Sequence, residues 1–279
     1  MCGLYGWIKG QDSPLDARAL AYLTSALAIA NVSRGDDSTG LASYRQGEDG
    51  PTVSKAARSA PQYVCEHQAE IHQACRGGAG WLMGHTRSMT KGAVTQENAH
   101  PFAIGNIVGA HNGTVNNEDA LRGQLTHAAN VPTCDSAALF ALAAQEGMKA
   151  TLAQLVGQAN LTWAVAPYAD ICLYQDTLHG LAVAYVPRWK LVLWSSEDTA
   201  VQRACALLGL PVVYDKTGKA PGYFMAIPAD KIVTFKPSHL GEDLTWIEEA
   251  APTQGRYAPL GSYPAISGYG GLDTSDTPK

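Results

Sequence analysis

Four strand-like segments follow one another between residues 161 and 195, separated only by short turns. They cover residues 161–167, 171–176, 181–186 and 190–195. This spacing is typical of antiparallel hairpins. Further strands are expected at 3–9, 41–45, 52–55, 80–86, 103–112, 222–227 and 231–236, with helices between them. The pattern predicts a layered α+β domain with antiparallel sheets.

Helices are expected where capping residues precede apolar residues at helical spacing. Ser13 is a suitable N-cap for a first helix, with Pro14 at its first position and Asp16 in its first turn. The apolar face of that helix consists of Leu15, Ala19, Tyr22, Leu23, Ala26, Leu27 and Ala30. Later helices are expected at 61–75, from 116–119 onward, from Asp135 onward as N-cap, and at 198–208.

The composition changes toward the C-terminal end. Residues 2–236 carry the strand and helix pattern and are expected to form one domain, with 237–279 as a tail. Pro and Gly supply nine of the 28 positions in 252–279, which predicts an irregular segment. Tyr257, Tyr263 and Tyr269 recur every six residues there. Both a partner-binding arm and a loosely ordered tail fit this pattern.

Composition and charge exclude several classes of function. The net charge is −5 and no Lys/Arg-rich block occurs, so nothing supports nucleic-acid binding. No stretch approaches the roughly 18 apolar residues of a membrane span, and we expect no membrane association. The six cysteines are scattered without a C-x-x-C pair, which favours free thiols and a cytoplasmic protein.

Cys2 follows the initiator methionine directly. Removal of Met1 would give this residue a free α-amino group beside its thiol, so that a nucleophile and a base lie within reach of each other. The adjacent Gly3 is expected to leave open space beside the thiol for a substrate carbonyl. From its position alone, Cys2 is more simply interpreted as the second residue of an ordinary strand.

Short polar motifs follow Cys2 in a set order. They are R-G-D-D-S-T-G at 34–40, G-H-T-R at 84–87 with N-A-H-P at 98–101, and H-N-G at 111–113 with C-D-S at 134–136. Together with the leading Cys-Gly, the set resembles the glutaminase domain of the class II glutamine amidotransferases, which are N-terminal-nucleophile hydrolases. The resemblance covers about residues 2–236. It implies a four-layer αββα sandwich of two antiparallel sheets flanked by helices.

The resemblance also implies roles for individual residues. Cys2 is the expected nucleophile, while the Asn112 side-chain amide and the Gly113 backbone N–H are the expected oxyanion hole. Arg87 matches the residue that binds the α-carboxylate of glutamine, and Asp135 the one that binds its α-ammonium group. Each also has a plain structural interpretation: Asn-Gly is a strong hairpin signal, and Asp before Ser-Ala-Ala-Leu is an ordinary N-cap.

Four further residues have expected supporting roles at the pocket. Thr90 and Gly92 lie where the family's substrate-covering loop begins, and backbone contacts to glutamine are expected there. His100 and Arg34 match motif positions that support the pocket. Ser88 departs from the family, which often carries an aromatic residue just after the arginine. The histidines at 85, 100 and 111 lack a carboxylate pattern, so no metal and no cofactor are expected.

The partners follow from the same resemblance. No pyrophosphatase loop, Walker A motif or phosphoribosyl-binding acidic run is present for a synthetase domain that consumes ammonia. The expected substrate is glutamine, with the ammonia acceptor on another polypeptide. A stand-alone γ-glutamyl amide hydrolase and a catalytically silent binding module stay open as alternatives, as does homo-oligomerisation.

Overall fold

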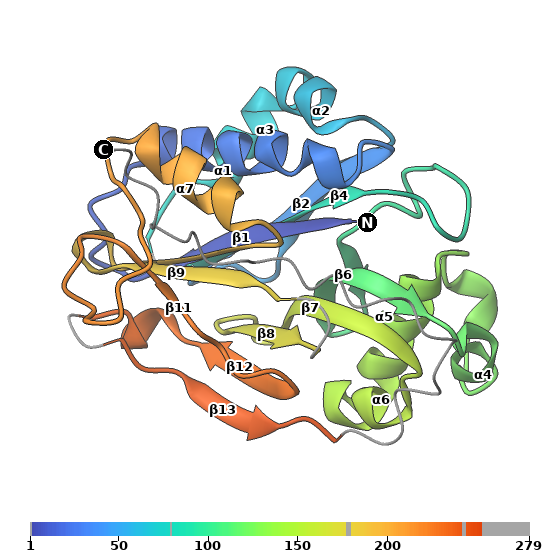
Figure 1. Cartoon of the computed structure of the whole chain (residues 1–279). Helices are drawn as coiled ribbons and strands as arrows, with labels where there is room; N and C mark the ends of the chain where they lie inside the picture. The colour runs from blue at the N-terminus through green and yellow to red at the C-terminus, as the bar shows by residue number, and fades with distance from the viewer. Residues whose placement is uncertain (1, 79, 177–179, 242–243, 253–279) are drawn as a thin grey trace, which may run out of the picture.

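The computed structural model describes residues 2–78, 80–176, 180–241 and 244–252. Within these residues, two antiparallel sheets lie face to face and helices cover the outer face of each (Figure 1). The α+β class and the αββα order of layers are therefore confirmed. Met1 and the tyrosines at 257, 263 and 269 lie outside the described residues.

The first sheet contains the N-terminal strand at its centre. Its strands run, from edge to edge, β11 (Tyr223–Met225), β9 (Ala182–Val186), β10 (Leu191–Ser195), β1 (Gly3–Lys9), β4 (Gly80–Arg87), β2 (Ser38–Arg45) and β3 (Thr52–Ala56). Side chains of β1 alternate between two cores, because successive residues of a strand point to opposite faces. Leu4 and Ile8 pack between the sheets, whereas Tyr5 and Trp7 pack beneath the helices. The chain therefore starts inside the fold.

The second sheet carries the H-N-G motif. Its order is β13 (Ile247–Ala250), β12 (Lys231–Phe235), β8 (Ile171–Gln175), β7 (Gly157–Val165), β6 (Ile107–Val115) and β5 (Phe102–Ile104). In β6, Val108 and Ala110 pack into the core between the sheets. The same alternation puts Asn112 on that inter-sheet face.

The helices form the two outer layers (Figure 1). The first sheet is covered by α1 (Ala17–Ala30), α2 (Ala60–Glu66), α3 (Gln68–Ala74) and α7 (Asp198–Ala206), and the second by α4 (Glu118–Arg122), α5 (Asp135–Glu146) and α6 (Met148–Gln154). Short 3₁₀ turns are η1 (Val32–Arg34), η2 (Ala128–Asn130), η3 (Pro187–Trp189) and η4 (Pro237–His239). None of the helices in the described ranges could cross a bilayer, since each is too short or too polar.

Several boundaries differ from the sequence-based expectation, and three of the differences lie in the first half of the chain. The first helix begins after Asp16, whose carboxylate accepts the Ala19 N–H at 2.7 Å, so Ser13 is not its N-cap. Aspartate caps as well as serine does, and here it stands closer to the apolar repeat. The helix expected at 61–75 breaks at His67 into α2 and α3. The strand expected at 103–112 is the hairpin of β5 and β6.

The second sheet continues past the boundary predicted at residue 236. Strand β13 pairs with β12 along its length, and the Ala251 N–H donates to the Asp230 carbonyl at 3.2 Å. Leu240 is buried in the inter-sheet core. Part of the segment assigned to the tail thus completes the edge of this sheet.

Candidate active site

Cys2 lies buried at the point where β1 begins and β4 ends. Gly3 pairs with Thr86, which brings Cys2 beside the last residue of β4, Arg87. The Cys2 Sγ accepts the Ser88 N–H at 3.4 Å. Burial raises the pKa of the Cys2 thiol, although the Ser88 N–H and the positive charge of Arg87 lower it in part. Burial therefore favours the thiol over the thiolate at this position.

Gly3 does not leave open space beside the thiol, contrary to the expectation from its size. A Cβ at this position would lie 2.6 Å from the Thr86 Oγ1 and 2.9 Å from the Asn31 side chain. Both distances are too short for a real contact. Gly3 is therefore required by the packing of β1 against its neighbours.

Asn112 and Gly113 lie inside strand β6, not in a hairpin turn. They pair with Asn160 and Ala159 of β7. The Asn112 Nδ2 donates to the Ser196 Oγ at 3.4 Å, and the same hydroxyl accepts the Leu4 N–H at 2.9 Å. This serine links the Asn112 amide to the first residues of β1, two positions from Cys2.

The Gly113 N–H points away from the neighbouring strand β7. Its partner Ala159 bonds instead to Asp176, donating its N–H to the carboxylate at 2.8 Å and accepting the Asp176 N–H at 3.1 Å. In an antiparallel ladder such residues alternate with those that bond across the pair. A side chain at Gly113 would also overlap the Gln158 carbonyl. The position therefore offers a backbone donor on a residue that has no side chain of its own.

Asp135 is the first residue of α5 rather than its N-cap, which is Cys134. Its carboxylate accepts the Val115 N–H at 2.8 Å and is almost fully buried. The bond joins the start of α5 to the end of β6, just past Gly113. The N-cap interpretation of this aspartate is therefore wrong, and its buried charge faces the strand that carries the proposed oxyanion donors.

Arg87 is buried at the end of β4, and its guanidinium binds the loop that follows. It donates to the Ala93 carbonyl at 3.1 Å and also to the Lys91 carbonyl. Gly92 lies between these residues with a φ of 76°, and a Cβ there would be 3.3 Å from the Cys134 backbone nitrogen. The loop thus passes close to the start of α5. Thr90, in the same loop, is exposed.

Arg34 contacts the backbone of Cys2. Its Nε donates to the Cys2 carbonyl at 2.9 Å, and its guanidinium pairs with Glu197. Nearby, the Asp37 carboxylate accepts the Met89 N–H at 2.6 Å. The 34–40 motif therefore fixes both the start of β1 and the turn after β4.

His100 lies in a buried stack of rings. Its ring centroid is 4.1 Å from that of His85 and 4.6 Å from that of Phe102. The His85 Nε2 lies 3.0 Å from the His111 carbonyl, so the stack bridges β4 and β6. This arrangement fits support of the pocket walls.

Comparisons with known proteins point to one family. Three curated relatives are named glutamine–fructose-6-phosphate aminotransferase [isomerizing]. They come from Sulfurisphaera tokodaii (34% identity over 128 residues), Neisseria meningitidis (32% over 126) and Streptococcus mutans (37% over 119). The matches cover 42–45% of this chain and 17–20% of the relatives, so the chain spans about a fifth of their length. No family model matches the chain.

Two solved structures share the fold over 89% of the chain and 49% of their own. One is the allosteric regulatory enzyme of purine biosynthesis, with a TM-score of 0.64 and 16% identity. The other is the glutamine phosphoribosylpyrophosphate amidotransferase of B. subtilis, at 0.63 and 17%. The chain is therefore similar to class II glutamine amidotransferases, in sequence over less than half of its length and in fold over most of it. Its fold is that of the N-terminal-nucleophile hydrolases.

The sequence did not reveal two contacts at this site, one made by the backbone of Ser88 and one by Ser196. Ser88 supplies the N–H that reaches the Cys2 thiol, and Ser196 joins Asn112 to β1. Ser88 acts through its backbone, which has no sequence signature. Ser196 lies 84 residues from Asn112, and only the facing of the two sheets brings them together.

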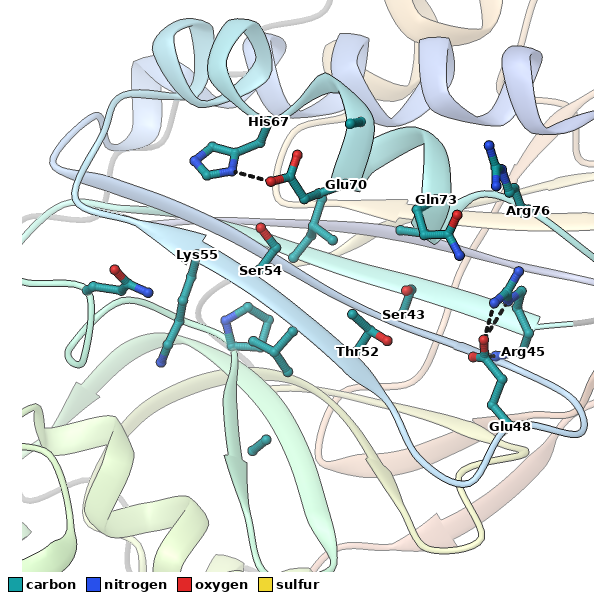
Figure 2. Close-up of a pocket in the computed structure, with 17 residues that line it drawn as sticks. Ser43, Arg45, Glu48, Thr52, Ser54, Lys55, His67, Glu70, Gln73 and Arg76 are labelled. Carbon is teal, nitrogen blue, oxygen red and sulfur yellow. Dashed lines mark hydrogen bonds and ion pairs between the residues drawn. The ribbon is translucent and has the colours of Figure 1, made fainter.

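The largest cavity among the described ones lies elsewhere in the domain. It has a volume of about 960 Å³ and runs along the edge strand β3 (Figure 2). Its charged groups largely pair with one another, as Arg45 does with Glu48 and His67 with Glu70. None of the predicted catalytic residues lines it. In the part of the chain that is described, no group of three His, Cys, Asp or Glu side chains could hold a metal ion.

Proposed function

We propose that the chain hydrolyses the side-chain amide of glutamine to glutamate and ammonia, with Cys2 as nucleophile after removal of Met1. The observation that carries the proposal is the convergence on Cys2 of Arg87, Ser88 and, through Ser196, Asn112. These groups come from both sheets and meet at one end of the inter-sheet space.

The nucleophile needs a base because burial raises the pKa of its thiol. A free α-amino group has a pKa of ~7.7–8.0 and is partly neutral near pH 7. It takes the thiol proton as Sγ attacks the amide carbon. The proton then passes to the departing nitrogen as the C–N bond breaks, leaving a γ-glutamyl thioester and ammonia. Attack by water on the thioester releases glutamate and restores the thiol.

The other predicted site residues bind the tetrahedral intermediate, bind the substrate or support the pocket. The negative oxygen of the tetrahedral intermediate is bound by the Asn112 amide and the Gly113 N–H, and the outward direction of that N–H supports this role. Arg87 binds the α-carboxylate of glutamine and Asp135 its α-ammonium group, with backbone contacts from Thr90 and Gly92. Arg34 and His100 hold the surrounding walls.

Ammonia is passed to an acceptor enzyme, which we place on a separate polypeptide. The curated relatives are named for transfer of nitrogen from glutamine to fructose 6-phosphate, and this chain matches only about a fifth of them. Co-purification with the full chain would identify the acceptor enzyme.

The test is release of ammonia and glutamate from glutamine by the purified protein. Cys2→Ala is expected to lower the rate at least about a thousandfold, as loss of a covalent nucleophile does. Cys65→Ala, which removes an exposed thiol, is the matched control and is expected to leave the rate unchanged. Intact mass shows whether Met1 is absent from the active protein.

Labelling by 6-diazo-5-oxo-norleucine tests nucleophile and pocket together. One label on Cys2, blocked by glutamine, is the expected result. Absence of both labelling and Cys2-dependent ammonia release, with or without co-purifying partners, would leave a silent binding module. Faster cleavage of γ-glutamyl anilides than of glutamine would assign the chain to γ-glutamyl amide hydrolysis instead.

A further inference from the structure

Three buried polar side chains on strands β7 and β10 have no hydrogen-bond partner among the described residues. The unpartnered atoms are the amide nitrogen and oxygen of Asn160, the hydroxyl oxygen of Thr162 and the indole nitrogen of Trp194. Their exposed fractions are 1%, 0% and 0%. Buried polar groups in native proteins are almost always satisfied, if not by protein then by ordered water.

These side chains face the same inter-sheet space. Ala164 of β7 packs into the inter-sheet core while Leu161 packs beneath the helices, so alternation turns Asn160 and Thr162 toward the first sheet. Trp194 enters the same core from β10 of the first sheet. It stands two residues before Ser196 in the sequence, the residue that contacts Asn112.

Asn160 is the direct cross-strand partner of Asn112. The two residues pair in the β6–β7 ladder, so their Cβ atoms are about 4.5–5.5 Å apart on one face. The Asn112 Nδ2 has two N–H groups, of which one is directed at Ser196. The second remains for the oxyanion. A donor aimed at the Asn112 Oδ1 would keep the amide from rotating by half a turn and presenting its oxygen there.

We propose that Asn160, with Thr162 and Trp194, binds an ordered water molecule that fixes the orientation of the Asn112 amide. The site offers the indole N–H as donor, the Asn160 amide as donor and acceptor, and a hydroxyl as either, which meets the two to four partners that a buried water needs. Asn160 is thus a positioning residue. This inference rests on the proposed glutaminase activity.

The kinetic test replaces Asn160 by leucine, which has nearly the same size but no polar atom. We expect kcat for glutamine to fall about tenfold or more, since complete loss of an oxyanion donor costs about 10²–10³. KM stays within about twofold, because Arg87 and Asp135 are untouched. Asn160→Ser, which keeps a polar group and leaves room for water, restores most of the rate. Thr162→Val gives a smaller loss.

A different effect of Asn160→Leu would overturn the proposal. If Asn160→Leu raises the melting temperature and leaves kcat unchanged, the amide is a dry, unpaired group and the proposal is wrong. Should Asn160→Leu fail to fold, a kcat of Thr162→Val equal to that of the unmodified protein overturns it instead.

A crystal structure at high resolution provides a readout that does not depend on activity. Density for a water within hydrogen-bond distance of Asn160 is expected in the unmodified protein and absent in Asn160→Leu. An empty site, in a map that resolves other buried waters, overturns the inference. If the protein releases no ammonia from glutamine, the proposed function fails while the water site is still decided by this density.

Discussion

Gly3 is tightly packed in β1 and lies next to Cys2, the proposed nucleophile. A methyl group there would press on Thr86 and Asn31, so Gly3→Ala forces β1 to shift. We predict a loss of about 1–3 kcal/mol in the free energy of unfolding, as for other overpacked sites, measured by urea denaturation. The shift also moves Cys2, so ammonia release from glutamine falls.

Gly50→Ala is the matched control for this substitution. A Cβ at Gly50 meets no atom within 4 Å, so its stability stays within about 0.5 kcal/mol of the unmodified protein. Equal stability of the Gly3 and Gly50 variants would contradict the packing role of Gly3.

At the scale of the element, strand β13 is expected to stabilise the second sheet. It covers the edge of β12, and the Trp246 ring just before it lies 6.1 Å from the Phe235 ring. We predict that a chain ending at residue 236 melts at a lower temperature than a chain ending at 252, because it exposes β12 and removes Leu240 from the core. Circular dichroism melts of the two chains measure this. Coincident melting curves would show that the domain ends at 236.

The strands were largely predictable because their hairpin spacing and apolar residues are local properties. The expected strands at 3–9 and 52–55 coincide with β1 and β3 to within a residue. Local signals failed where two of them compete. Asn112-Gly113 has the sequence of a turn, but its long pairing with β7 keeps it in a strand. Asp135 has the sequence of an N-cap, yet its carboxylate binds Val115 from another element.

The motif order led to the proposal of Cys2, Arg87 and Asn112 as site residues, but the contacts that hold these residues were not predictable. The links made by Ser196 and by the Ser88 N–H depend on how the two sheets face each other. The requirement for glycine at position 3 likewise depends on the residues that the fold brings next to it, Thr86 and Asn31. No local pattern encodes such contacts.

At the scale of the whole molecule, burial favours the neutral form of three histidines around strands β4 and β6. Burial lowers the pKa of His85 from 6.5 to about 3 and that of His100 well below 6.5. The charges of Arg87 and Lys55 act in the same direction on His100. Burial also lowers the pKa of His111, although Asp135 and the Gln158 carbonyl partly counter this. The unfolded chain therefore binds more protons than the folded one below pH 6.5.

The contribution of these histidines to the free energy of unfolding is therefore complete above pH 6.5. It falls as the pH drops below 6.5 toward the pKa values of the histidines in the folded protein. Each histidine held neutral contributes about 1.4 kcal/mol to this fall for each pH unit below 6.5.

His100→Phe keeps a ring between His85 and Phe102 but removes one titrating group. We predict that its loss of unfolding free energy between pH 7.5 and 5.5, measured by urea denaturation, is about 1.4 kcal/mol smaller than that of the unmodified protein. The exposed His127 provides the control, because His127→Phe leaves the loss unchanged. An identical loss in all three proteins would mean that His100 takes up a proton without unfolding, and that the space between the sheets admits charge.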